Sequence, residues 1–343
     1  MELKLKTTEE QNSGESEENL LNSGQKSVPL QKPTMYDGKR ALEEIEKKRK
    51  KALGARVWLV FCWLLEIAVF VSVFVAAVKD VEEKVIIISF TVAILSARFL
   101  KRKASDWDKR VYRNFVSCYT DEFVSIVIRS LFDGAFYNYE TGFSKQDVQQ
   151  MKIVQLGNKF YSEDFMRAVY HDVHFRRADV LIEDVEQTGG FMADERKITL
   201  FQGAIYEFEF NKPFVCNMQV RDKNFPSPDR PSDRGKLERV QLENVLFNRK
   251  YKTYTTNAHE TFYILTPQIM EQILKLSDKY LSMSMNFVDQ KLIIAIHTAK
   301  GSFEPSHLTK KMDYEEEKEK IRSEVMEIIE IVERLKLDNK LFA

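Results

Sequence analysis

The sequence predicts an α+β protein in which a two-helix transmembrane hairpin precedes a cytosolic domain with a mainly antiparallel sheet, a stem helix and a C-terminal helix. Two apolar runs, residues 57–78 and 85–100, flank the short charged connector KDVEEK. After about residue 157 the apolar residues alternate with polar ones, as in strands with one buried face. Residues 314–337 return to apolar spacings of three and four, which are typical of a helix.

Composition limits the classes of protein to consider. The 343 residues include 52 basic and 52 acidic side chains, so the chain lacks the overall positive charge that favours nucleic acid, and we expect no nucleic-acid partner. The 24 Phe and 13 Tyr residues can build a substantial core. Cys62, Cys118 and Cys216 show no paired spacing, which favours a reducing compartment and buried structural thiols.

The segment before the first apolar run divides into two parts. Residues 1–38 are rich in Glu, Ser, Asn, Gln and Lys, and we predict a disordered acidic tail because so few apolar residues cannot offset the entropy of ordering. Residues 39–56 carry eight basic and three acidic side chains and predict a basic juxtamembrane helix. This helix could lie on anionic lipid headgroups, could act only as a topology signal, or could do both.

Length and flanking charge predict how residues 57–100 cross the membrane. A hydrocarbon core about 30 Å thick needs about 20 helical residues, which the first run supplies and the shorter second run approaches. Basic residues precede the first run and follow the second, whereas the connector is mostly acidic. The positive-inside rule then predicts two spans in the cell membrane with both termini in the cytoplasm. The alternative is a buried helical pair in a soluble core.

Two ionisable residues lie within this predicted hairpin. Glu66 falls roughly 14 Å into the first span, counted from Val57, and Arg98 lies near the end of the second. Intramembrane charges usually face protein and have a partner, so we predict a Glu66–Arg98 pair. The alternative is that Glu66 serves as a functional carboxylate in an oligomeric interface.

Residues 101–343 are predicted to form the cytosolic α+β domain. Its stem helix covers residues 104–133, where apolar residues recur at helical spacing. Ser144 and Asp147 resemble a capping box for a short helix. We predict strands in VHFRRADVLIEDV and KITLFQGAIYEFEF, and again in RVQLENVLFNRKYKTYT and ETFYILT.

The end of the chain repeats this alternation of strands and helices. Pro267 opens a predicted helix, with Thr266 as its cap. A strand hairpin is expected to turn on Asp289-Gln290. The C-terminal helix has a short heptad seam that could pack on the sheet or form a coiled coil.

The search for catalytic chemistry leaves one weak candidate region, residues 161–179. Zinc needs three or four converging ligands. His171 and His174 would share one face if this segment were a helix, but they would point to opposite sides if it were a strand. No phosphate-binding, dinucleotide-binding or nucleophile motif is found, so we assign no catalytic, cofactor-binding or metal residue and expect no cofactor. The residues kept as candidates, here and in the hairpin, are Glu66, Arg98, Glu163, Asp164, His171 and His174.

Two stretches of the second half resemble a known family. VQLENVLFNRKYKTYTTNAHETFYILTPQIMEQILKL and MNFVDQKLIIAIHTAKGSFEP are similar to the bacterial membrane-associated family known as domain of unknown function 3137. The resemblance covers about residues 105–305 and rests on a Y-x-L-T-P element at 263–267 and an F-E-P element at 303–305. Asn248 and Arg249 depart from its usual pattern. The resemblance implies two N-terminal spans and a soluble domain, and it brings no catalytic residues.

The sequence therefore favours a membrane-anchored cytoplasmic binding or scaffold module. Its expected partners are the lipid bilayer and either another protein or a second copy of itself. The alternative is a membrane-tethered hydrolase or ligand sensor that uses residues 161–179. Convergence of His171, His174, Glu163 and Asp172 on one cleft would favour the enzyme, and their dispersal would favour the module.

Overall fold

The computed structural model describes residues 35–78, 83–132, 134–171, 173–187, 195–226, 237–298 and 301–336. Most of the predicted disordered tail lies outside these ranges and stays a prediction. Its last residues are helical, because the first described helix begins at Met35. Asp172 and most of the connector between the apolar runs also lie outside the described residues.

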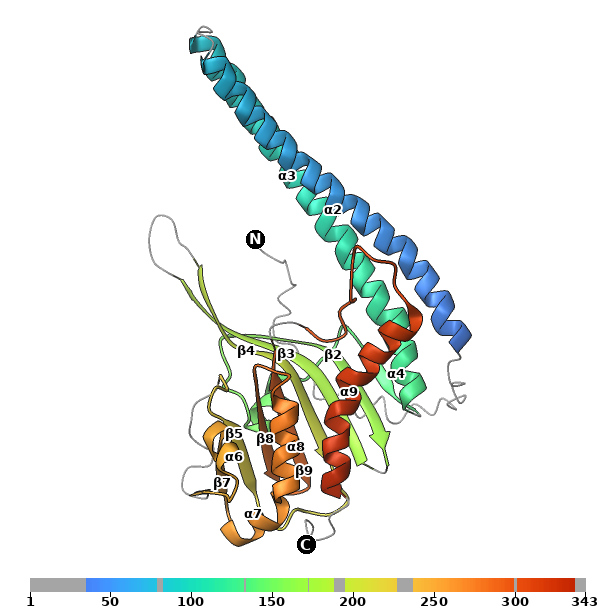
Figure 1. The fold of residues 1–343 in the computed structure, drawn as a ribbon, viewed down its shortest axis with the longest axis vertical. Coiled ribbons are helices and arrows are strands. Elements are labelled where there is room, and N and C mark those ends of the chain that lie inside the picture. The colour runs from blue at the N-terminus through green and yellow to red at the C-terminus, as the bar shows by residue number, and fades with distance from the viewer. Residues whose placement is uncertain are drawn as a thin grey trace. The chain divides into compact units, whose positions relative to one another are not determined.

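Two long helices form an antiparallel pair at the start of the chain. Helix α2 (Met35–Val78) joins the predicted juxtamembrane helix to the first apolar run, and α3 (Glu83–Cys118) joins the second run to the stem; the two lie side by side (Figure 1). By length and hydropathy, α2 is the one helix among the described residues that could cross a membrane. The prediction of a membrane segment is thus supported, whereas its second span is not shown by this criterion.

The stem continues through an irregular turn. After α3 the chain forms a π-helix, η1 (Tyr119–Val124), and then α4 (Ser125–Leu131). The predicted stem helix is therefore present, although it is not regular. Short π-helical insertions often mark functional positions, and here Tyr119 and Phe123 turn into the core with no exposed surface.

Nine strands form one sheet with every neighbouring pair antiparallel, as predicted. The spatial order is β1-β2-β3-β4-β9-β8-β5-β7-β6. The strands are β1 (Phe136–Asn138), β2 (Lys159–Tyr170), β3 (Val173–Gln187), β4 (Glu195–Glu209), β5 (Met218–Asp222), β6 (Glu238–Val240), β7 (Tyr251–Thr255), β8 (Ser282–Val288) and β9 (Lys291–His297). Strands β8 and β9 form the predicted hairpin, with Asp289 at a positive φ of 51° in its turn.

Helices cover both faces of the sheet. On one face, α4, α8 (Pro267–Ser277) and α9 (Tyr314–Lys336) enclose the larger core, and α8 and α9 lie against the sheet in Figure 1. On the other face, α5 (Lys145–Met151) and the segment after it cover a smaller core. The predicted caps are confirmed: Ser144 and Asp147 form a capping box, and Thr266 caps α8, which Pro267 opens.

The region 243–265 differs from the prediction. In place of two long strands it contains α6 (Val245–Lys250), the short β7 and α7 (Ala258–Ile264). The physical reason is capping by two asparagines, which supply side-chain acceptors for the first N–H groups of each helix. Asn244 accepts from Phe247 N, and Asn257 accepts from His259 N and Glu260 N. These caps outweigh the strand preference of the Thr, Phe, Tyr and Ile residues that follow.

Candidate functional site

A cleft of about 870 Å³ opens between the sheet and α9. Ala204, Tyr206 and Ile296 of strands β4 and β9 contribute apolar lining, and the turns 278–281 and 301–307 contribute most of the rest. The family-like F-E-P element at 303–305 lies in the second of these turns. Polar side chains around the cleft include Asp278, Lys279, Ser302, Glu304, Ser306, His307, Glu316, Lys320 and Glu324.

A buried ion pair lies beside the cleft. Arg177 and Asp179 alternate with apolar residues along β3 and face α9, and Arg177 is only 1% exposed. The Arg177 guanidinium donates to the Asp179 carboxylate and lies 4.4 Å from the centre of the Phe303 ring. Burial is the largest single effect and lowers the pKa of Arg177, but Asp179, Tyr206 and Asp164 together outweigh burial and raise that pKa.

Asp179 also holds the turn that carries the F-E-P element. Its Oδ2 accepts from the backbone N of Ser302 at 2.6 Å, and its Oδ1 accepts from Ser302 Oγ at 2.8 Å. A residue 123 positions earlier in the chain thus fixes the start of this turn. Phe303 follows with φ of +54°, a conformation that is unfavourable for a side chain of this size and that the surrounding bonds must maintain.

Two carboxylates of α9 bind the rest of the same turn. Glu324 accepts from Phe303 N at 2.9 Å, and Glu317 accepts from Ser306 N at 3.3 Å. The second oxygen of Glu317 accepts from the hydroxyl of Tyr119 at 2.6 Å. Glu317 therefore connects the wall of the cleft to η1, which continues the helix of the second apolar run.

Asp164, a residue that the sequence suggested, belongs to this cluster. It lies at a bulge of β2 with φ of +58° and is 6% exposed. Its carboxylate accepts from the hydroxyl of Tyr137, and its carbonyl accepts from Arg177 Nη1 at 3.3 Å. Burial, and then the charge of Asp179, raise the pKa of Asp164 to about 7, while Arg177 and the Tyr137 hydroxyl oppose this rise.

Of the other candidates in 161–179, Glu163 lies beside the cluster, where partial burial and the charges of Asp179 and Glu304 raise its pKa, whereas the two histidines lie away from it. Glu163 pairs in register with Asp179 but is exposed. His174 pairs with Val169 near the end of the β2–β3 hairpin, about 17 Å from Asp179 along β3. His171 lies at that end with φ of +44° and stacks on Tyr170. The described residues hold no group of three or more His, Cys, Asp or Glu suited to a metal ion. Asp172, the fourth residue of the criterion stated above, lies outside the described residues, so the choice between module and enzyme stays a prediction.

The predicted Glu66–Arg98 pair is wrong. Glu66 Oε2 lies 3.0 Å from Lys101 Nζ, one helical turn beyond Arg98, whose side chain is exposed. The antiparallel register of α2 and α3 decides which residue pairs with Glu66. The 3.0 Å ion pair between Arg56 and Asp108 is a second contact in the same register. The ammonium of Lys101 further lies 3.8 Å from the Trp63 ring.

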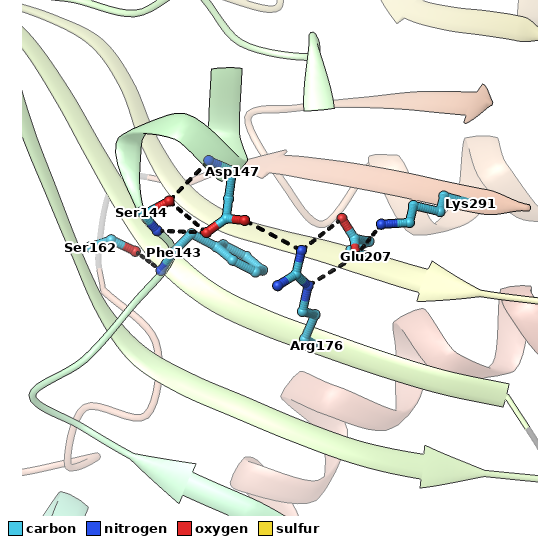
Figure 2. A network of polar contacts seen from close by, with 7 residues as sticks. All are labelled: Phe143, Ser144, Asp147, Ser162, Arg176, Glu207 and Lys291. Carbon is cyan, nitrogen blue, oxygen red and sulfur yellow. Dashed lines mark hydrogen bonds and ion pairs between the residues drawn. The ribbon is translucent and has the colours of Figure 1, made fainter. Parts of the chain in front are cut away.

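A second polar network holds α5 on the opposite face of the sheet (Figure 2). Arg176, the neighbour of Arg177, points to this face and binds Glu207 through two nitrogens, at 2.9 and 3.3 Å. Arg176 Nη2 also lies 3.6 Å from Oδ1 of Asp147, which belongs to the capping box of α5. Lys291 Nζ lies 3.3 Å from Glu207 Oε1. Since the members of this network are paired with one another, we regard it as structural.

Sequence reasoning missed Arg177, Ser302 and Glu324. The signal available for Arg177 and Asp179 was their position, since charged residues stood where the period-two pattern of β3 requires inward-facing side chains. Ser302 and Glu324 carried no such signal. Ser302 matters because it binds Asp179, 123 positions earlier, and Glu324 matters because its carboxylate binds Phe303 of the turn, 21 positions earlier.

We predict that Asp179→Asn lowers the free energy of unfolding by about 3–5 kcal/mol, because it leaves the buried Arg177 charge without its partner. The measurement is urea unfolding of the full chain in detergent. The control is Asp278→Asn, which removes a 76% exposed partner of Lys250 and should cost less than about 1 kcal/mol. Equal losses in the two variants would contradict a central role for Asp179.

We predict that Asp164→Asn changes how stability depends on pH. An unfolded aspartate releases its proton near pH 4, whereas folded Asp164 holds it to about 7. The folded state therefore binds more protons between these values, so stability falls as pH rises through this window. The variant, with a neutral acceptor for Tyr137, should remove this loss and gain stability relative to wild type above pH 7, on the order of a few kcal/mol. Urea unfolding at pH 5 and pH 8 measures the gain, which the exposed-site control Asp121→Asn should not show.

Comparisons with known proteins support part of the sequence-based resemblance. No curated protein matches the chain. A crystal structure of the mycobacterial trehalose monomycolate transport factor A, TtfA, matches at a TM-score of 0.34 and 10% identity, over 64% of this chain and 93% of that one, and this low score supports no conclusion about fold or role. The sequence profile described as "Protein of unknown function (DUF3137)" matches residues 199–337, from β4 through α9, and so includes the F-E-P and Y-x-L-T-P elements. Residues 199–337 of this chain are thus similar to the DUF3137 family of proteins of unknown function.

Proposed function

We propose that this protein is a membrane-anchored binding module whose ligand or partner occupies the cleft beneath α9. In this proposal α2 and α3 form two spans, both termini are cytoplasmic, and the sheet domain lies in the cytoplasm. The family is described only as one of unknown function, so the proposal rests on the physical features of the chain itself.

The exposed apolar band of α2 carries the proposal. Its best 18-residue window has a mean hydropathy of 1.9, and only 11% of that window is buried. A core helix of a soluble domain would be mostly buried, and an apolar surface of this size is rare on soluble monomers. The exposed large side chains are Val57, Trp58, Val60, Phe61, Trp63, Leu64, Leu65, Ile67, Phe70, Val71, Phe74 and Val75.

The second span is supported by the pairing of the two helices. Helix α3 runs antiparallel to α2 along this band, and its own Leu95, Phe99 and Leu100 are exposed as well. A helix beside a transmembrane helix lies in the same apolar environment, where its backbone N–H and C=O groups must be hydrogen-bonded within the protein. The helical hydrogen bonds of α3 meet this requirement. Lys101 lies near the boundary and reaches Glu66 from its long side chain.

Binding in the cleft is supported by its size and its construction. A volume of about 870 Å³ lies within the range of ligand sites, and the lining combines apolar side chains with charged and polar ones that could orient a ligand. Buried carboxylates from two separate elements, β3 and α9, hold one wall in place. Rigid support of this kind is what a preorganised binding site needs.

We predict that the double change Leu64→Arg and Val71→Arg prevents stable membrane insertion. Each arginine should oppose insertion by about 2.5–3.5 kcal/mol. The measurement is the fraction of full-length protein that stays with membranes after alkaline carbonate extraction. The matched control is the double change Leu246→Arg and Val245→Arg in α6. These two residues are 63% and 62% exposed, about as much as Leu64 and Val71. Retention of the α2 variant at the level of the control would overturn the anchor.

We predict that a photo-crosslinking amino acid placed at His307, an exposed residue of the cleft, yields a discrete adduct in native membranes. The same group at Lys275, an exposed residue of α8 outside the cleft lining, should not yield that adduct. Identification of the adduct by mass spectrometry then defines the ligand or partner. Identical adducts at both positions would contradict binding in the cleft.

A further inference from the structure

The structure separates two basic segments that the sequence places equally close to the membrane. Residues 47–56 of α2 and 98–113 of α3 together contain thirteen basic and two acidic side chains. One of the two acids, Asp108, is buried and already binds Arg56. Both segments could therefore attract anionic headgroups if each lay at the membrane surface.

The register of the helical pair shows that they lie at different heights. Lys101 is beside Glu66 and Trp63, and Arg56 is beside Asp108 and Tyr112. Lys48 is beside Cys118, whose thiol is the main cause of the raised pKa of Lys48. At 1.5 Å per residue, Lys48 lies about 25 Å along the pair from Lys101, away from the apolar band.

Tryptophans mark the height of the membrane surface. The chain contains three Trp residues, and all three fall on this part of the pair: Trp58 and Trp63 on α2 and Trp107 on α3. Each is at least 37% exposed. Tryptophan favours the interface between headgroups and acyl chains, so these three side chains place that interface near residues 103–108 of α3.

Distance then decides which basic residues reach the headgroups. The headgroup layer is roughly 5–8 Å thick on each side, and salt screens charges beyond about 8–10 Å. The exposed basic residues of α3 flank the tryptophans within that range. The α2 residues 39–50 lie about 12 Å or more beyond Trp58, the nearest tryptophan on the same helix, and their buried stripe of Leu42 and Ile45 packs into the domain core.

We infer that the exposed basic residues of α3 between 98 and 113 form a binding surface for anionic phospholipid headgroups, and that the basic residues of 39–50 do not. This inference rests on the proposed membrane anchor, and it places the lipid contact on α3, whereas the sequence offered residues 39–56 as one possible contact. The surface, called here the α3 collar, consists of Arg98, Arg102, Lys103, Lys109, Arg110 and Arg113.

Quenching of the three tryptophans by brominated lipids tests the inference with the full chain. The protein is reconstituted in bilayers at 0.1 M salt that contain equal fractions of brominated phosphatidylglycerol or brominated phosphatidylcholine. The ratio of quenching by the two lipids gives the selectivity for the anionic one. We expect a clear preference for brominated phosphatidylglycerol that 1 M salt abolishes.

Two variants with the same change in charge locate the surface. Replacing Arg102, Lys103, Lys109 and Arg110 by Gln should lower the selectivity at least fivefold, because each basic residue near the surface contributes about 1 kcal/mol. Replacing Lys39, Arg40, Lys47 and Lys50 by Gln should leave it unchanged. Equal losses in both variants, or full selectivity in the first, would overturn the inference. If neither brominated lipid quenches the wild type, the proposed anchor itself has failed.

Discussion

The buried pair of Arg177 and Asp179 is the interaction on which the turn at 301–306 and the cleft beside it depend. A charge as deeply buried as that of Arg177 persists only with a partner, and Asp179 supplies it while also accepting two hydrogen bonds from Ser302. The pair therefore joins β3 to the turn at 301–306. Without it the turn would lose its attachment to the sheet, and the cleft would lose one of its walls.

The same turn is attached to the helical pair of α2 and α3 through α9. Glu317 binds both Ser306 of the turn and Tyr119 of η1, and η1 follows α3 without a break. The helical pair thus has a direct polar connection to the cleft wall, in addition to its packing on the core. A connection of this kind would suit the proposed membrane-anchored binding module, since it couples the cleft wall to the helical pair.

Several features of the fold could be predicted because their causes are local. The capping box at Ser144, the Thr266-Pro267 start of α8 and the turn at Asp289 each depend on residues within a few positions of one another. The antiparallel sheet could be predicted from period two. The strand predicted for ETFYILT was wrong because an equally local signal, the Asn257 cap, was given too little weight against strand propensity.

By itself, the sequence determined the apolar band, the order of most elements and the resemblance of residues 199–337 to a family of unknown function. Only the tertiary structure decided the partners: Lys101 in place of Arg98 for Glu66, Ser302 for Asp179, and Tyr119 for Glu317. Periodicity and capping act between near neighbours and can be read along the chain. A buried charge is stabilised by whichever group the packing brings within hydrogen-bonding distance, and that depends on the register of helices and strands far apart in sequence.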